Sequence, residues 1–235
     1  MPSIDQIINR QFKQWEMEQM ERRRVSEPQV VQPPTIITVS REHGSRGAYF
    51  AQRLADSLGI QRMHREVIDA ICKSSGYRKH IVESLDEKYR SSITMIAESI
   101  LTGQAMHHDD YTSNLFKVVL SMGRLGGVVL VGRCGNFILG PKIGFHIRVV
   151  CPVEQRVDNL MRYTNATETE ARRAIATYDA DRRELVRKLF NADINDPHHY
   201  DMIWNSGTVD IEDMVECAKV SFEAKRKKLL YFNVV

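Results

Sequence analysis

Short apolar segments rich in β-branched residues alternate along this chain with longer segments of helical periodicity. The first such segment, TIITVS at residues 35–40, is typical of a buried strand. Further strands are predicted at residues 60–64, 128–132, 145–151 and 200–205. Helical patterns fill the intervals between them, including 66–75, 80–124 and the stretch after Asp210. Because strands separated by helices pair in parallel, the sequence predicts an α/β fold with helices on both faces of a five-stranded parallel sheet.

The composition excludes several classes of protein. A chain of 235 residues with 43% hydrophobic and 27% charged residues is neither wholly disordered, collagen-like nor a disulfide miniprotein. No apolar run approaches the roughly 18 residues that span a bilayer, so no membrane partner is expected. The four cysteines form no C-x-x-C, which favours reduced thiols in a cytoplasmic protein. The net charge of +3 gives no reason to expect nucleic acid as a partner.

The first 34 residues are predicted to be an appendage to the main domain, which spans residues 35–235. Apolar residues recur at helical spacing over residues 3–25, from Ile4 to Trp15, with charged residues between them. The prolines within residues 26–34 then predict a stiff, extended linker. Two interpretations of residues 3–25 stay open: a helix docked on its own domain, or a surface for a homodimer or a partner protein.

The loop after the first predicted strand carries the features of an anion site. Ligands of parallel α/β sheets bind at the carboxyl ends of the strands. Here Gly44 and Gly47 allow a ligand to approach the amides at the start of a helix, and Arg41 and Arg46 add positive charge. The usual Gly-Lys pair of a phosphate loop is absent, so a tight turn with surface arginines is the alternative.

Several motifs, in order along the chain, extend this interpretation. SREHGSRGAYFAQRLADSLGI and the following HREVI resemble the start of the cytidylate kinase-like family, and the resemblance resumes at VLVGRCGNFIL. It continues through FHIRVVCPVEQRVDNLM and YDADRRELVRKLF to NDPHHYDMIWNS, and only residues 76–124 match poorly. The resemblance covers roughly residues 35–225. It implies a P-loop NTPase-type fold with a helical insertion for a nucleoside monophosphate at about 65–124 and a lid at about 162–190.

The resemblance also implies a reaction, the Mg²⁺-dependent transfer of the ATP γ-phosphoryl group to CMP or dCMP. The phosphates of ATP would be bound by the first loop, through Arg41, Gly44, Ser45, Arg46, Gly47 and Ala48. The lysine of true cytidylate kinases falls at Gly47, the hydroxyl that binds magnesium falls at Tyr49, and the acidic residue falls at Val131. Arg46 is the candidate replacement for the lysine, and Glu42 is a magnesium candidate by position only.

The acceptor and the lid involve other segments of the chain. By resemblance, the acceptor nucleotide would contact His64, Arg65, Arg133 and Asn136. The candidate catalytic residues of the lid are Asp179, Arg182 and Arg183, and helical spacing predicts that Asp179 pairs with Arg183. The resemblance makes Arg182 an arginine that lid closure delivers to the transition state. Arg156 and Arg162 are candidates for a lid or adenine contact.

Two alternatives to a nucleoside monophosphate kinase follow from departures from the family pattern. The absent lysine, hydroxyl and acidic residue favour a catalytically degenerate module that binds nucleotides or a partner. His64 and Cys134 stand where cytidylate kinases have acidic residues, and this favours a kinase for another small molecule.

Overall fold

The computed structural model describes residues 10, 13–15, 17–18, 20–21, 36–74, 76, 78–79, 81, 85, 87–102 and 110–232. It contains a five-stranded sheet of order β2-β3-β1-β4-β5, in which every pair of neighbours is parallel. The strands are β1 (Ile36–Arg41), β2 (Gln61–Met63), β3 (Val128–Val131), β4 (Phe145–Val150) and β5 (Met202–Asn205). The predicted α/β fold with a five-stranded parallel sheet is confirmed.

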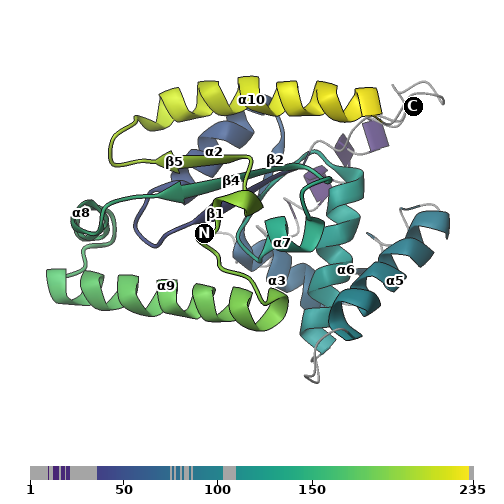
Figure 1. Cartoon of the computed structure of the whole chain (residues 1–235), viewed down its shortest axis with the longest axis horizontal. Helices are drawn as coiled ribbons and strands as arrows, with labels where there is room; N and C mark the ends of the chain where they lie inside the picture. Colours follow the sequence, from purple (N-terminus) through teal and green to yellow (C-terminus); the bar gives the residue numbers. More distant parts are fainter. Residues whose placement is uncertain are drawn as a thin grey trace.

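Helices lie on both faces of this sheet (Figure 1). The helices are α2 (Gly47–Leu58), α3 (Arg65–Lys73), α5 (Glu87–Thr102), α6 (Asp110–Leu125), α7 (Gly135–Leu139), α8 (Val153–Thr164), α9 (Glu168–Phe190) and α10 (Ile211–Phe232), and the short 3-10 helix η1 is Pro197–His199. Helix α7 was not predicted, because its five residues are too few to produce a helical periodicity. Within the part of the chain that the structure describes, no helix is long and apolar enough to cross a membrane.

The alternation of side chains along β1 divides the core into two clusters. Ile37 and Val39 are fully buried among residues of α2 and α10. Ile36 points the other way and packs with residues of α3 and α6. Since both faces of the central strands are covered, the carboxyl-terminal edge of the sheet is where a ligand has access to the ends of the strands.

The described residues near the N-terminus are helical, and Trp15 docks on the main domain. Trp15 is only 2% exposed, and its indole Nε1–H donates a hydrogen bond of 3.2 Å to the carbonyl of Gly126. Gln61 of β2 donates from its side-chain amide to the Glu18 carboxylate at 2.9 Å. These contacts favour the interpretation in which the first helix packs on its own domain. Most of the predicted 3–25 helix and the whole linker lie outside the described residues.

The docking of Trp15 can be measured by fluorescence, because the chain has two tryptophans. In a Trp204→Phe variant we expect the emission of Trp15 to be blue-shifted and shielded from acrylamide, since a buried indole has little contact with water. The Trp15→Phe variant, which reports on the less buried Trp204, is the control. Emission of Trp15 that is quenched as strongly as free tryptophan would contradict the docking.

His146 of β4 is a buried histidine between β1 and the turn after α7. The Nδ1 atom of its ring lies 2.8 Å from the hydroxyl oxygen of Thr38, and the Nε2 atom lies 2.9 Å from the carbonyl oxygen of Gly140. His146 as a whole is 2% exposed. Burial and the nearby Lys225 lower the pKa of His146, although the hydrogen bond to Gly140 and the charge of Asp201 act in the opposite direction. The fold therefore favours the neutral ring.

This preference predicts how stability depends on pH. The unfolded chain binds a proton at His146 with an ordinary pKa of about 6.5, whereas the folded chain binds it only at lower pH. The contribution of His146 to the free energy of unfolding is therefore complete above about pH 6.5 and is lost as the pH falls below it. Burial also lowers the pKa of His43, which adds to the same trend.

Urea unfolding between about pH 5 and about pH 8 measures this dependence. In His146→Gln we expect the loss of stability on the acid side to be shallower than in the wild type. His198→Gln serves as the control, because the His198 side chain is 90% exposed. Equal slopes in the wild type and His146→Gln would show that His146 does not contribute.

Candidate functional site

The loop between β1 and α2 has a backbone that depends on glycine at one position in particular. Gly44 has φ +81°, and a Cβ atom on it would lie 2.8 Å from the carbonyl oxygen of Arg156 in α8. Asn159, also in α8, donates its side-chain amide to the Gly44 carbonyl at 3.0 Å. Helix α8 therefore packs against the loop at Gly44 and fixes its position. The loop then enters α2 through Arg46, which has a left-handed backbone conformation with φ 58°.

Inside the loop, polar contacts fix the chain before α2 begins. Ser45 is fully buried, and its hydroxyl donates to the Glu42 carbonyl at 2.9 Å. The carbonyl of Ser45 in turn accepts a hydrogen bond of 2.7 Å from the hydroxyl of Ser206, which follows β5. The loop is therefore preorganised beside the N-terminus of α2, where the N-cap residue Arg46 makes no side-chain capping hydrogen bond and backbone amides can bind an anion.

A single carboxylate, that of Asp179 in α9, connects the loop to two arginines. Its Oδ1 accepts from the His43 backbone amide at 3.0 Å and from Arg182 Nη1 at 3.2 Å. Its Oδ2 accepts from Arg156 Nη1 at 2.5 Å. The expected pairing of Asp179 with Arg183 is wrong, because contacts with the loop and α8 orient the carboxylate toward Arg182 instead.

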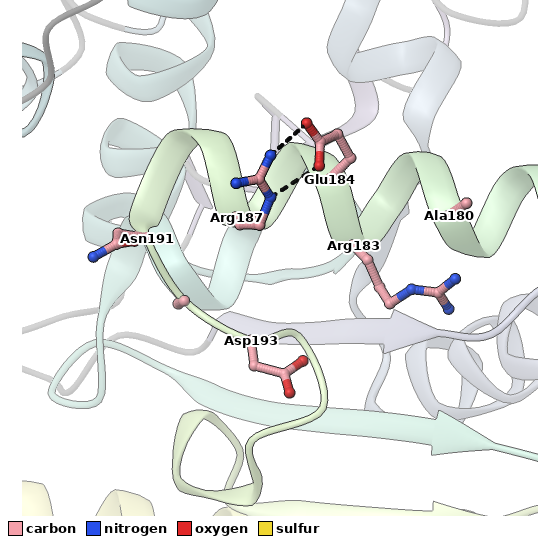
Figure 2. Close-up of a pocket in the computed structure, with 7 residues that line it drawn as sticks. Ala180, Arg183, Glu184, Arg187, Asn191 and Asp193 are labelled. Carbon is pink, nitrogen blue, oxygen red and sulfur yellow. Dashed lines mark hydrogen bonds and ion pairs between the residues drawn. The ribbon is translucent and has the colours of Figure 1, made fainter.

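Arg183 lies apart from this network, in a groove between the C-terminal half of α9 and the segment that follows it. The groove is lined by Ala180, Arg183, Glu184, Arg187, Asn191, Ala192 and Asp193. In Figure 2 the side chain of Arg183 extends from α9 with no interaction drawn to another lining residue, while Arg187 donates hydrogen bonds to Glu184. The structure therefore brings Asp179 and Arg182 to the loop and leaves Arg183 outside it.

Arg156 and Arg162 occupy different environments on α8. Arg156 is 6% exposed, and its guanidinium donates to the His43 carbonyl at 3.4 Å as well as to Asp179. It lies beneath the loop, where it compensates Asp179 and Glu42. Arg162 is exposed near the C-terminal end of the same helix.

Glu42 is anchored rather than solvated. Its Oε2 accepts from the backbone amide of Cys151 at 2.9 Å and lies 3.7 Å from Arg156 Nε. Its Oε1 makes no hydrogen bond to any residue that the structure describes. Among those residues, no group of three or more His, Cys, Asp or Glu side chains is arranged to hold a metal ion. The loop thus offers one carboxylate oxygen, which fits a magnesium ion bound mainly through substrate phosphates and water.

Arg46 and Gly47 decide which cation the loop can supply. A Cβ atom on Gly47 would lie 2.6 Å from the Cβ of Arg41, so no side chain fits at the position of the usual lysine. The Arg46 guanidinium lies 5.2 Å from the ring centroid of Tyr49 and 5.8 Å from that of Tyr163. Both rings therefore contact the Arg46 guanidinium, and both tyrosines are exposed.

The guanidinium of Arg41 turns away from the loop and toward the end of β3. It lies against Gly132, where a Cβ atom would collide with its Nη1. Burial, followed by repulsion from Arg182, Arg65 and Arg133, lowers the pKa of Arg41 to about 10, although Glu66 acts in the opposite direction. Arg41 thus belongs to a cluster of cations at the carboxyl ends of β1 and β3.

Arg133 reaches this cluster through a left-handed turn after β3. Gly132, Arg133 and Cys134 have φ angles of 79°, 53° and 53°, which is strained for the two residues with a side chain. The Arg133 guanidinium pairs with Asp69 of α3, which lies 3.7 Å from Arg65 Nε and also accepts from the Tyr111 hydroxyl at 2.6 Å. The turn therefore holds Arg133 and Arg65 on one shared carboxylate.

The remaining acceptor candidates lie around the same edge of the sheet. His64 precedes α3 and its Nδ1 lies 2.7 Å from a carboxylate oxygen of Glu66. Asn136 is 6% exposed, and its side-chain amide lies 3.5 Å from the carbonyl of His199 in η1. Asn136 therefore links α7 to η1 rather than standing free in the site.

Sequence reasoning missed three residues that shape this region: Asp69, Tyr111 and Arg148. Arg148 could have been found, because it is the one charged residue in the apolar strand FHIRVV. Asp69 and Tyr111 gave no such signal, since each lies on an ordinary amphipathic helix and meets Arg133 only in the folded chain.

The chain is similar to known proteins over most of its length. The sequence pattern of the cytidylate kinase-like family matches residues 36–208. A cytidylate kinase from Ignicoccus hospitalis is 23% identical over 185 residues, which cover 79% of this chain and 97% of that kinase. A solved structure of an uncharacterized protein from Eubacterium ventriosum has a TM-score of 0.63 at 19% identity, covering 80% of this chain and 98% of the other.

A different similarity covers only part of the chain. A uronate isomerase from Corynebacterium glutamicum is 30% identical over 100 residues, or 42% of this chain. The chain spans only 19% of the length of that isomerase.

The network around Asp179 predicts a large effect on stability. Because the carboxylate is 13% exposed, Asp179→Ala leaves the buried Arg156 with only the longer, 3.7 Å ion pair to Glu42, and it leaves His43 with an unpaired amide. We expect the free energy of unfolding in urea to fall by about 3–5 kcal/mol. Glu184→Ala, which removes an exposed partner of Arg187 from the same helix, is the matched control and should change little. Similar losses in both variants would show that the Asp179 contacts are not special.

Proposed function

Because the chain belongs to the cytidylate kinase-like family, we propose that it transfers the γ-phosphoryl group of ATP to a nucleoside monophosphate, with CMP or dCMP as the preferred acceptor. The observation that carries the proposal is the gathering of arginines at the carboxyl ends of β1 and β3. Arg133 and Arg65 share the Asp69 carboxylate there, Arg182 donates to the Arg41 carbonyl, and burial, followed by the charges of these three arginines, lowers the pKa of Arg41 against the opposite effect of Glu66. Cations that repel one another in this way favour a polyanionic ligand between them.

On the donor side, the loop between β1 and α2 contributes mainly backbone groups. The amides of residues 44–48 would bind the phosphates of ATP at the N-terminus of α2. The helix dipole and the amides at a helix N-terminus both favour a bound anion. Bound Mg²⁺ would neutralise charge on the β- and γ-phosphates, with Glu42 as its one contact in the loop. Arg46 supplies the nearest positive charge of the loop and replaces the lysine of related kinases with a guanidinium.

On the acceptor side, the attacking group is an oxygen of the acceptor phosphate. This oxygen is already negatively charged at neutral pH, so no general base is required. Its bond to the γ-phosphorus forms as the bond from that phosphorus to the β,γ-bridging oxygen breaks, and ADP leaves with the electron pair. Arg133 and Arg65 would position the acceptor phosphate from the Asp69 side, and His64 and Asn136 would contact the rest of the nucleotide.

Helix α9 completes the site. Arg182 Nη1 donates to the Arg41 carbonyl at 3.2 Å, so this arginine already lies over the end of β1. In this position its charge would stabilise the negative charge on the transferring group, as arginines do in phosphoryl transfer. The proposed roles therefore need α9 in the position that Asp179 and its partners hold.

One observation favours a second candidate function, a module that binds nucleotides without turning them over. The packing of Gly47 against Arg41 excludes any side chain at the position of the usual lysine. This candidate predicts that calorimetry detects binding of ATP or CMP by a protein that forms no ADP.

An assay of phosphoryl transfer from ATP to CMP, dCMP, UMP and AMP tests the proposed reaction. We expect turnover with CMP or dCMP, and a fall of kcat on the order of 100- to 1000-fold in Arg182→Lys, because a preorganised fork of donors is lost. Arg173→Lys, at an exposed position of the same helix, is the control and should retain wild-type kcat. Absence of ADP with every acceptor would refute the proposed function and leave the binding module.

A further inference from the structure

Tyr111 is a tyrosine at the start of α6 that reaches the Asp69–Arg133 ion pair from the helical insertion. It is partly buried and packs against the hydrophobic cluster that includes residues of α3. Its hydroxyl donates to Asp69 Oδ1 at 2.6 Å, and the Arg133 guanidinium lies 5.8 Å from the centroid of its ring. Tyr111 therefore contacts both members of the ion pair, one through its hydroxyl and the other through its ring.

The two oxygens of the Asp69 carboxylate have different partners. Oδ1 accepts from Tyr111, whereas Oδ2 pairs with Arg133 Nη2 and lies 3.7 Å from Arg65 Nε. Because a carboxylate is planar, a donor that holds Oδ1 also sets the direction in which Oδ2 points. The hydroxyl on α6 thus fixes the orientation of the carboxylate on α3 to which Arg133 binds.

The Arg133 guanidinium is held at one nitrogen and near one aromatic ring. Its Nη2 pairs with Asp69, while its distance from the Tyr111 ring is within the range of a cation–π contact. Among the residues that the structure describes, the buried Nε of Arg133 has no hydrogen-bond partner. A guanidinium carries its donors in one rigid plane, so these contacts fix the plane and leave further donors for a ligand.

The hydroxyl of Tyr111 acts as a donor at neutral pH. Burial, followed by the hydrogen bond to Asp69, raises the pKa of Tyr111, although the charge of Arg133 acts in the opposite direction. The phenol therefore stays protonated. Its hydrogen points to a carboxylate of the protein, so its contribution to the site is orientation and not proton transfer to a substrate.

We propose that Tyr111 is a positioning residue, which together with Asp69 fixes the plane in which Arg133 presents its remaining donors to the acceptor. The proposal rests on the proposed function and adds to it a role for the insertion. Tyr111 lies within residues 76–124, the stretch that resembles the family least. The insertion of this chain would thus set the geometry of an arginine that follows β3.

The alternative is a purely structural role, in which Tyr111 only packs α6 on α3. A structural role predicts that substitution lowers stability and leaves the kinetic constants of the folded protein unchanged. A positioning role predicts that kcat with CMP falls while KM for ATP is unchanged, because a small displacement of the acceptor slows an in-line transfer.

Steady-state kinetics with ATP and CMP separate these roles. We expect kcat to fall on the order of 10-fold in Tyr111→Phe, which loses the hydroxyl, and further in Tyr111→Leu, which also loses the ring. In an Arg133→Lys background Tyr111→Phe should cost little more, because lysine has no planar fork to orient. Asp110→Asn, at the exposed neighbouring position of α6, is the control and should retain wild-type kcat.

A second measurement needs no substrate. In NMR spectra of isotope-labelled wild type we expect separate signals from the two Nη groups of Arg133, since its contacts restrict rotation of the guanidinium. We expect one averaged signal in Tyr111→Leu, and the loss of these signals in Arg133→Lys assigns them.

Three results would overturn the proposal: wild-type kcat in both Tyr111 variants, losses that multiply in the variant with Arg133→Lys, or an averaged Arg133 signal in the wild type. If Tyr111→Leu does not fold, Tyr111→Phe and its combination with Arg133→Lys decide. Failure of the proposed function is distinguishable, because the wild type would then form no ADP with any acceptor. The same variants compared by their Kd for CMP, together with the Arg133 signals, would still decide the role of Tyr111.

Discussion

The contacts of the Asp179 carboxylate hold together three elements that the sheet alone would not bring into register. They join the loop after β1, helix α8 and helix α9 through His43, Arg156 and Arg182. Without this carboxylate, two guanidinium groups would repel each other beside the N-terminus of α2. Because one of its oxygens occupies a loop amide, the position of α9 and the binding of an anion by the loop are linked.

The sequence predicts the parts of this molecule whose signal is local. The strands follow from runs such as TIITVS, and the start of α9 follows from Thr167 and Glu170, whose spacing is that of the capping box they form. The partner of Asp179 was not predictable, because spacing on α9 allows Arg182 or Arg183 and only the distant Arg156 and His43 decide between them. Asp69 is a similar case, since its partner Arg133 comes from a strained turn 64 residues away.

The loop illustrates how packing constrains the choice of cation. Arg41 packs so closely on Gly47 that no lysine side chain fits at this position. The positive charge instead comes from guanidinium groups on several elements, among them Arg46 on the loop and Arg182 on α9. A guanidinium is always charged and less strongly hydrated than an ammonium, so it can be partly buried at lower cost.

Some arginines of the site are carried by strands of the sheet, and others are carried by a helix. This difference suggests that anion binding and the position of α9 are coupled. Arg41 and Arg148 are carried by neighbouring strands and cannot move without disrupting the sheet, whereas Arg182 moves with α9. An anion bound by the arginine cluster at the carboxyl ends of β1 and β3 would attract Arg182, and α9 would be held over the site more strongly once that anion is bound. The hydrogen bond from Arg182 to the Arg41 carbonyl provides the direct link. Since Arg41 ends β1 and Glu42 begins the loop, the same strand would then place an arginine of the cluster directly before the donor contacts of the loop, which brings the two bound anions close together, as an in-line transfer between them requires.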